Sequence, residues 1–141
     1  MTIPQKFHAG GFLFNPHEGE ILLHQRDGNT KFNPHKWAFF GGLNEGEESP
    51  KECFIREVKE ELNVDLQPEE VILLTEYLNI ELDTYKYVFY AHSTLKESEM
   101  TLGEGAGFSW VPISSLPDYD LTEKTEKDLK LFLESRDSEM R

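Results

Sequence analysis

Three glutamates, Glu57, Glu60 and Glu61, have the i, i+3, i+4 spacing that places side chains on one face of a helix. Like charges one turn apart repel, at a cost of roughly a few tenths of a kcal/mol per pair in an isolated helix. A divalent cation would offset that repulsion. Mg²⁺ takes hard oxygen ligands, usually one or two carboxylates, with water and substrate phosphate oxygens in its other positions. The spacing is therefore compatible with a metal site for phosphate chemistry, although three such glutamates alone also fit an ordinary solvated helix face.

The surrounding residues predict the helix that would position these carboxylates. Ser49 followed by Pro50 is typical of an N-cap and first helical position, and Ser49 to Glu52 fits a capping box. Asn63 ends the predicted helix, because asparagine tolerates the left-handed conformation found there. A second stripe is apolar and predicts burial against a sheet; it comprises Phe54, Ile55, Val58 and Leu62.

Two further features single out this segment. Gly41 and Gly42 follow the apolar run that begins at Trp37, which predicts a strand over Trp37–Gly42 and a close backbone approach to a ligand or metal. Arg56 lies apart from both helix stripes, at a spacing that allows it to pair with Glu60 or with Glu52. The lone cysteine, Cys53, is interpreted as a small buried hydrophobic residue.

From Gly42 to Val64 the chain resembles the signature of the Nudix hydrolases, G-x5-E-x7-R-E-U-x-E-E-x-G-U, where U is aliphatic. Gly42, Glu48, Arg56, Glu57 and the later glutamates all match. The signature glycine is replaced by Asn63, a mild departure because asparagine is also tolerant of left-handed geometry. Phe40 and Glu47 replace a frequent proline and a frequent glycine, and neither change removes a carboxylate.

The resemblance implies a role for each residue of the motif. It implies that Mg²⁺ or Mn²⁺ is held by Glu57, Glu60 and Glu61 with the backbone carbonyl of Gly41, and that Glu48 is a further ligand or anchors one. It implies that Arg56 orients a carboxylate through its rigid fork. The general base is Glu60 or Glu104, the latter on a glycine-rich loop resembling one that often carries a metal ligand or base in the family.

Candidate substrate contacts lie outside the motif. Arg26 follows an aliphatic strand, as in the family, and is predicted either to contact substrate phosphate or to pair with Asp27 at the surface. Tyr119 and Asp120 are candidates for the pocket rim, because family members often place substrate-selecting residues near this position. His8 is interpreted as a partly exposed strand histidine, with a substrate contact as the alternative.

The remaining pattern predicts a mixed α/β chain. Strands are expected over 6–15, 20–26, 71–82, 84–94 and 108–111, with a final helix from Glu123 to about Ser135 that is capped by Thr122. Periodicity alone reaches α+β; the resemblance implies the Nudix α/β/α sandwich with a mixed sheet. The 141 residues are expected to form one domain, residues 1–141.

Composition limits the partners. The net charge of −13 argues against polymeric nucleic acid and anionic membranes, both of which bind positive surfaces. One cysteine excludes an intramolecular disulfide and agrees with a cytoplasmic location, and no apolar run is long enough to span a membrane.

The expected activity is Mg²⁺- or Mn²⁺-dependent hydrolysis of the pyrophosphate linkage in a small nucleotide, implied by the resemblance. An ordinary or oxidised nucleoside triphosphate is the first candidate substrate, followed by ADP-ribose, nucleotide sugars and dinucleoside polyphosphates. A non-catalytic nucleotide-binding module and an isopentenyl-diphosphate-type isomerase are the alternatives, and Cys53 is a poor nucleophile for the latter. A homodimer, frequent in the family, stays open.

Overall fold

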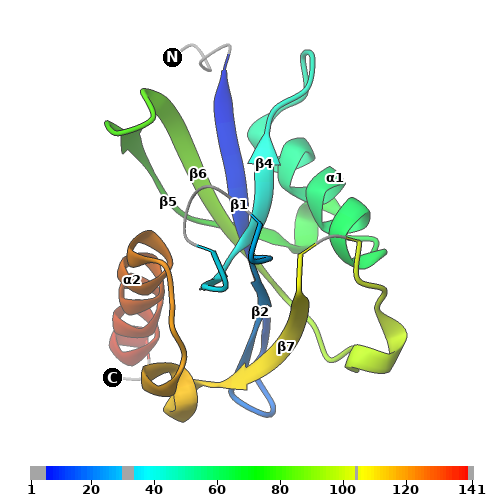
Figure 1. Ribbon diagram of the computed structural model, residues 1–141, viewed down its shortest axis with the longest axis vertical. Coiled ribbons are helices and arrows are strands. Elements are labelled where there is room, and N and C mark those ends of the chain that lie inside the picture. Colours follow the sequence, from blue (N-terminus) through cyan, green and yellow to red (C-terminus); the bar gives the residue numbers. More distant parts are fainter. Residues whose placement is uncertain (1–5, 30–33, 104, 140–141) are drawn as a thin grey trace.

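A single mixed β-sheet with one long helix on each face organises the chain (Figure 1). The computed structural model describes residues 6–29, 34–103 and 105–139. Within them, seven strands are joined in one sheet whose main path runs β3-β2-β1-β6-β5. This arrangement confirms the predicted mixed α/β sandwich.

The strands have clear boundaries. They are β1 (Phe7–Asn15), β2 (Glu20–Gln25), β3 (Trp37–Ala38), β4 (Phe40–Leu43), β5 (Val71–Asn79), β6 (Thr84–His92) and β7 (Gly107–Pro112). The central strand β1 pairs antiparallel with β2 and β4 and parallel with β6. The consecutive strands β1 and β2, and likewise β5 and β6, form antiparallel pairs.

The helices are α1 (Pro50–Leu62) and α2 (Glu123–Glu139), with 3₁₀ turns at Pro68–Glu70, Glu97–Glu99 and Ile113–Asp118. The predicted bounds of α1 are confirmed. The final helix continues four residues beyond the expected Ser135. Thr122 caps it as predicted, since its hydroxyl accepts the amide N–H of Thr125 at 3.3 Å.

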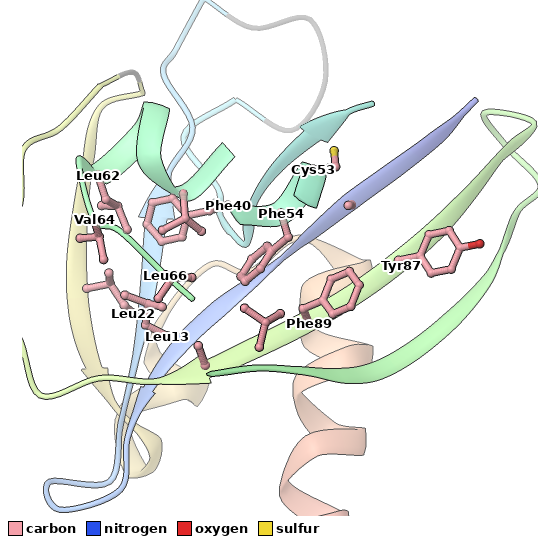
Figure 2. Close-up of a cluster of buried hydrophobic side chains, with 14 of the residues drawn as sticks. Leu13, Leu22, Phe40, Cys53, Phe54, Leu62, Val64, Leu66, Tyr87 and Phe89 are labelled. Atoms are coloured by element: carbon pink, nitrogen blue, oxygen red, sulfur yellow. The ribbon is translucent and has the colours of Figure 1, made fainter. Parts of the chain in front are cut away.

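Two apolar clusters sandwich the sheet. One lies under α1, where Phe54, Val58 and Leu62 pack on the sheet (Figure 2). The other lies under α2, where Leu129 and Phe132 are buried. Alternate residues of one strand therefore enter opposite clusters, as the two-residue period of a strand requires.

The expected single strand Trp37–Gly42 is wrong in one respect, because it is two strands with different partners. β3 pairs with β2, whereas β4 pairs with β1. Phe39 at the break packs in the α2-side cluster while Phe40 packs under α1. The imidazole of His24 donates from Nε2 to the carbonyl of Phe39 at 2.9 Å, so the break leaves no unsatisfied oxygen there.

Two other strands are also shorter in the structure than the sequence predicts. β5 ends at Asn79 rather than Leu82, and β6 ends at His92 rather than Thr94. The turn between them has Asp83 at a φ of 48°, a left-handed conformation that a strand does not continue through. The backbones of β1 and β6 approach closely at Gly11, since a Cβ there would overlap the carbonyl of Phe89 on β6.

Candidate active site

Helix α1 is fixed at both ends by the residues that the sequence indicates. The Ser49 hydroxyl accepts the amide N–H of Glu52 at 3.2 Å, and the Glu52 carboxylate accepts the amide N–H of Ser49 at 2.8 Å. Asn63 adopts the left-handed conformation, with φ 57° and ψ 38°, and its amide N–H donates to the carbonyl of Lys59. These caps fix the start and the end of the helix, and the positions of its residues around the helix axis determine where its carboxylates point.

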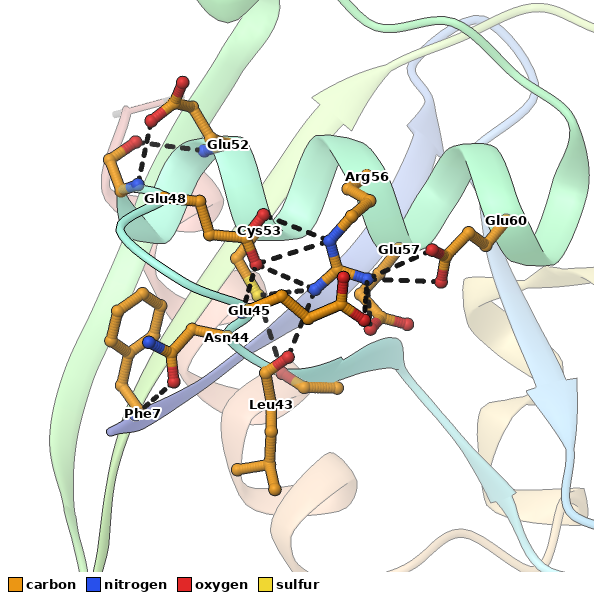
Figure 3. Close-up of polar contacts among 12 residues, drawn as sticks. Phe7, Leu43, Asn44, Glu45, Glu48, Glu52, Cys53, Arg56, Glu57 and Glu60 are labelled. Atoms are coloured by element: carbon orange, nitrogen blue, oxygen red, sulfur yellow. Dashed lines mark hydrogen bonds and ion pairs between the residues drawn. The ribbon is translucent and has the colours of Figure 1, made fainter. Parts of the chain in front are cut away.

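The guanidinium of Arg56 is the centre of the polar site on this helix (Figure 3). Its Nε and Nη2 atoms donate to the Glu48 carboxylate, at 3.0 and 2.7 Å in their shortest contacts. Its Nη1 atom donates to Glu57 at 3.1 Å and to Glu60 at 3.2 Å. Glu45 adds an ion pair at 3.5 Å. The predicted pairing of Arg56 with Glu60 is thus confirmed, while the carboxylate of Glu52 is committed to the helix cap.

These contacts shift the protonation equilibria of the partners. Hydrogen bonds from Arg56 hold the pKa of Glu48 below its usual value. The same hydrogen bonds, with the surrounding carboxylates, raise the pKa of Arg56, so the guanidinium stays charged. The single positive charge of Arg56 therefore forms ion pairs with four carboxylates, those of Glu45, Glu48, Glu57 and Glu60, which leaves an excess of three negative charges in the cluster.

The glycine pair of β4 lies against two buried carboxylates. A Cβ on Gly42 would overlap the carboxylate of Glu57, whose residue is only 9% exposed. The amide N–H of Gly41 donates to the carboxylate of Glu61 at 3.1 Å, and Glu61 is 4% exposed. The absence of a side chain at Gly42 thus brings β4 directly onto the acidic face of α1.

The donor set fits a hard divalent cation. Carboxylate oxygens are the ligands that Mg²⁺ prefers, and buried carboxylates in negative excess are stabilised by an added cation. In the described residues, no three acidic, histidine or cysteine side chains already converge as a metal site. Instead, Glu57 and Glu60 share the Nη1 atom of Arg56.

The glycine-rich loop that follows β6 crosses the end of α1. The amide N–H of Gly103 donates to the carbonyl of Glu61 at 2.7 Å. A Cβ on Gly105 would lie 3.2 Å from Nδ1 of His24. Glu104, the candidate base or ligand between these two glycines, lies outside the described residues.

The other predicted substrate contacts lie farther along the sheet. The amide N–H of Arg26 donates to the carbonyl of Lys36 at 2.9 Å, and the Arg26 charge acts on His8 and His24. Tyr119 packs edge-on against Trp37, with ring centroids 5.2 Å apart. Asp120 forms an exposed ion pair with Lys36 at 3.7 Å. Tyr119 and Asp120 therefore lie beside β3, whereas the motif carboxylates lie beside β4.

Two polar residues of the sheet, His24 and Lys86, were not predicted from the sequence to have a role, whereas the interpretation of Cys53 is confirmed. His24 was not singled out, although a histidine inside an aliphatic strand is an available signal; burial lowers its pKa to about 4. Lys86 lies on β6 among aromatic residues and was also missed. Cys53 is fully buried, as expected, and burial raises the pKa of its thiol to about 12, which argues against nucleophilic chemistry.

Comparison with known proteins identifies the fold and the family. The family model for the NUDIX domain matches residues 4–134. A MutT structure from a study of Aliivibrio salmonicida and Vibrio cholerae is similar, with 22% identity, a TM-score of 0.72 and coverage of 89% of this chain and 94% of that chain. A MutT/Nudix family protein from Listeria innocua gives 18% identity, a TM-score of 0.74 and coverage of 99% and 98%.

A third similar structure is part of a larger enzyme. It is the bifunctional NMN adenylyltransferase/ADP-ribose pyrophosphatase of Francisella tularensis, in complex with AMP and a manganese ion. The identity is 19% and the TM-score 0.72, with 95% of this chain and 42% of that chain covered. Among the described helices of the present chain, none has the length and apolar character needed to cross a membrane.

Proposed function

This chain belongs to the Nudix hydrolase family, and from that premise we propose that it hydrolyses a nucleoside triphosphate, ordinary or oxidised, to the monophosphate and pyrophosphate. The proposal treats residues 1–141 as one catalytic domain. The observation that carries it is the cluster in which one guanidinium serves four carboxylates beside the glycine pair of β4. Such a cluster matches a substrate that arrives with a divalent cation on its phosphates.

The chemistry is nucleophilic attack by water on phosphorus. A new P–O bond forms to the water oxygen, the P–O bond to the leaving pyrophosphate breaks, and a carboxylate takes the proton from the water. A bound Mg²⁺ or Mn²⁺ supplies charge neutralisation on the phosphate oxygens and lowers the pKa of bound water.

Each carboxylate has a role that suits its position. Glu57 and Glu61 are buried and held by Arg56 and by the Gly41 amide, so they suit the holding of a cation in a fixed place. We assign the Gly41 carbonyl and Glu60 to the same ligand set, and we assign Glu48 to anchoring Arg56. The Glu60 side chain is 54% exposed, which also leaves it able to take a proton from water. Glu60 and Glu104 are therefore the two candidates for the base.

A second candidate activity is hydrolysis of ADP-ribose or a nucleotide sugar. The similarity to the Francisella enzyme, whose name includes ADP-ribose pyrophosphatase, supports this second candidate. A non-catalytic nucleotide-binding module is a weaker candidate, because every carboxylate of the motif is retained.

The test is a hydrolysis panel at neutral and alkaline pH with Mg²⁺ or Mn²⁺. It includes nucleoside triphosphates, 8-oxo-dGTP, ADP-ribose, nucleotide sugars and dinucleoside polyphosphates. Glu60→Gln and Glu104→Gln are run beside Glu69→Gln, which changes an exposed glutamate in the 3₁₀ turn before β5. Loss of a base or ligand is expected to lower kcat on the order of a thousandfold.

The panel also defines failure. Cleavage of a nucleotide sugar or ADP-ribose, with nucleoside triphosphates untouched, would replace the first activity by the second. Binding without cleavage under either metal would establish the binding module instead. A Glu60→Gln enzyme with normal kcat would remove Glu60 as base and as an essential ligand.

A further inference from the structure

The sheet face opposite α1 has a row of polar side chains at one end of β1. Phe7 and Ala9 pack in the cluster under α1, so His8 between them faces the other side of the sheet. Tyr85 and Tyr87 likewise pack toward α1, so Lys86 also faces the other side. The two side chains are therefore on the same face, the one that α2 covers farther along.

Strand register places His8 and Lys86 next to each other. His8 pairs directly with Lys86 between the parallel strands β1 and β6. Lys86 in turn pairs with Tyr77 of β5, and His8 pairs with Leu43 of β4, which is 48% exposed. Neighbouring strands lie about 4.8 Å apart, so the two basic groups are close neighbours on one surface.

Gly10 and the end of α2 mark the limits of this row. Gly10 follows on the same face, and a Cβ there would lie 3.2 Å from Cε1 of His8, so the ring leans over a position that has no side chain. In Figure 1 the upper ends of β1, β4 and β6 extend past the end of α2. The end of the sheet that carries His8 and Lys86 is therefore not covered by α2.

Neither His8 nor Lys86 has a strong partner in the described part of the chain. The Nδ1 atom of His8 is buried and makes no hydrogen bond there. A buried polar atom without a partner is rare in native proteins and calls for a structural or functional explanation. Lys86 forms no ion pair with a described carboxylate; Asp128, the acidic group that acts on its charge, accepts a hydrogen bond from Tyr77 at 3.0 Å.

The two side chains differ in the hydrogen bonds that they can make. Burial and the nearby charges of Lys86 and Arg26 lower the pKa of His8 to about 4, so its ring is neutral near pH 7. A neutral imidazole has one nitrogen that accepts a hydrogen bond. Burial also lowers the pKa of Lys86, but an ammonium group has only donors. The pair thus offers one acceptor beside one donor.

The row is also close to the candidate active site. Gly42, which lies against the Glu57 carboxylate, pairs with Ala9, the residue next to His8. The carboxylates are on one face of β4 and β1, and the polar row is on the other face at the same end. Within the described sheet β4 pairs with β1 alone, so a nucleotide whose phosphates lie at the carboxylates would pass around the free edge of β4 to place its base at the polar row.

We propose that His8 and Lys86 are specificity-determining residues that select a base with a lactam edge, a ring carbonyl beside a ring N–H, as in guanine and hypoxanthine. Lys86 donates to the carbonyl oxygen and His8 accepts the adjacent ring N–H. Adenine presents the reverse pattern, an amino donor beside a ring acceptor. Its amino group would face the ammonium donor of Lys86, and its ring acceptor would face the acceptor of His8. This inference rests on the proposed function for the position of the phosphates.

The test compares GTP, ITP and ATP as substrates, and GMP, IMP and AMP as ligands. The variants are Lys86→Met, His8→Phe, the conservative Lys86→Arg, and the control Lys130→Met on the exposed side of α2. Wild-type enzyme is expected to favour GTP and ITP over ATP. Lys86→Met is expected to raise KM for GTP and ITP by about 10- to 100-fold, the fold-change for a hydrogen bond to a charged group, with little change in kcat.

The pattern across variants separates recognition from simple charge. Lys86→Arg is expected to keep the preference and Lys130→Met to leave all constants unchanged. An equal loss for GTP and ATP on Lys86→Met would overturn the proposal, because it would show that Lys86 binds phosphate. Unchanged KM values in Lys86→Met and His8→Phe would overturn it as well.

A binding measurement keeps the proposal independent of catalysis and of variant folding. Nitrogen-15 NMR of the wild-type histidine side chains is expected to show a shift of the His8 resonance with GMP and IMP but not with AMP. If no triphosphate is cleaved and this selective shift is seen, the proposed function fails and the base selection stands. If triphosphates are cleaved and GMP and AMP shift His8 equally, the base selection fails and the proposed function stands.

Discussion

Replacing Arg56 by glutamine is expected to lower the stability of the protein substantially. The change removes the hydrogen bonds from Arg56 to Glu48, Glu57 and Glu60, and it leaves the carboxylates facing one another without a positive charge. Arg56 connects the loop before α1 to the helix itself, so the loss acts on both.

The magnitude follows from the burial of the pair. Breaking a fully buried ion pair costs about 3–5 kcal/mol, whereas an exposed pair contributes less than about 1 kcal/mol. The side chains of Arg56 and Glu48 are 22% and 15% exposed, so an intermediate loss of about 2–3 kcal/mol is expected. For a chain of this length, that loss corresponds to a fall in Tm of roughly 7–10 °C.

The assay is thermal unfolding of Arg56→Gln, Glu48→Gln and the double variant. The cycle isolates the coupling between the two side chains, expected at about 1–3 kcal/mol for charged partners in contact. Arg56→Lys keeps the charge but not the two-pronged geometry, so an intermediate Tm is expected. A fall in Tm of less than 2 °C for Arg56→Gln, or additive single changes, would refute the view that Arg56 holds this cluster together.

Three further predictions concern individual positions. Gly42→Ala is expected to lower kcat at least tenfold, because the new Cβ displaces the Glu57 carboxylate; Gly107→Ala, which meets no atom within 4 Å, is the matched control, and equal kinetics in the two variants would contradict the role of Gly42. Asn63→Gly is expected to hold or raise stability and Asn63→Ala to lose about 1 kcal/mol, measured by denaturant unfolding, since alanine resists the left-handed conformation. Arg56 depresses the folded-state pKa of Glu48, so this carboxylate stabilises the fold at pH values above its ordinary pKa of 4.5, and the stabilisation is lost as the pH falls through the lower folded-state pKa. Glu48→Gln should therefore weaken the fall in stability with acid in unfolding curves measured from pH 6 to 2, and an unchanged fall would contradict the assignment.

Local signals explain what could be predicted from the sequence. The capping box at Ser49 and Glu52 and the left-handed Asn63 depend on residues within one or two turns, and both are found as expected. The carboxylate face of α1 follows from the 3.6-residue period alone. These features determine the phase of the helix and therefore most of the candidate site.

Features that depend on distant pairing could not be predicted in the same way. Helical spacing offered Arg56 two partners, Glu60 and Glu52, yet its closest contact is with Glu48 in the preceding loop. At the break between β3 and β4, the Phe39 carbonyl is satisfied by the imidazole of His24, fifteen residues earlier. The pairing of His8 with Lys86 arises from the parallel register of β1 and β6, which neither strand's own sequence determines.

The two halves of the Arg56 guanidinium are expected to respond differently to a cation. Nε and Nη2 hold Glu48 and the carbonyl of Leu43, which fixes the loop, whereas Nη1 contacts Glu57 and the more exposed Glu60. A cation that takes oxygens of Glu57 and Glu60 competes with Nη1 alone. Titration with Mg²⁺, followed by NMR, should therefore leave the Arg56 Nε–H protected from exchange, while the carboxyl resonances of Glu57 and Glu60 shift. Loss of Nε–H protection on titration would show instead that the cation displaces Arg56 as a whole, and Glu48 would then belong with the ligands rather than with the anchor.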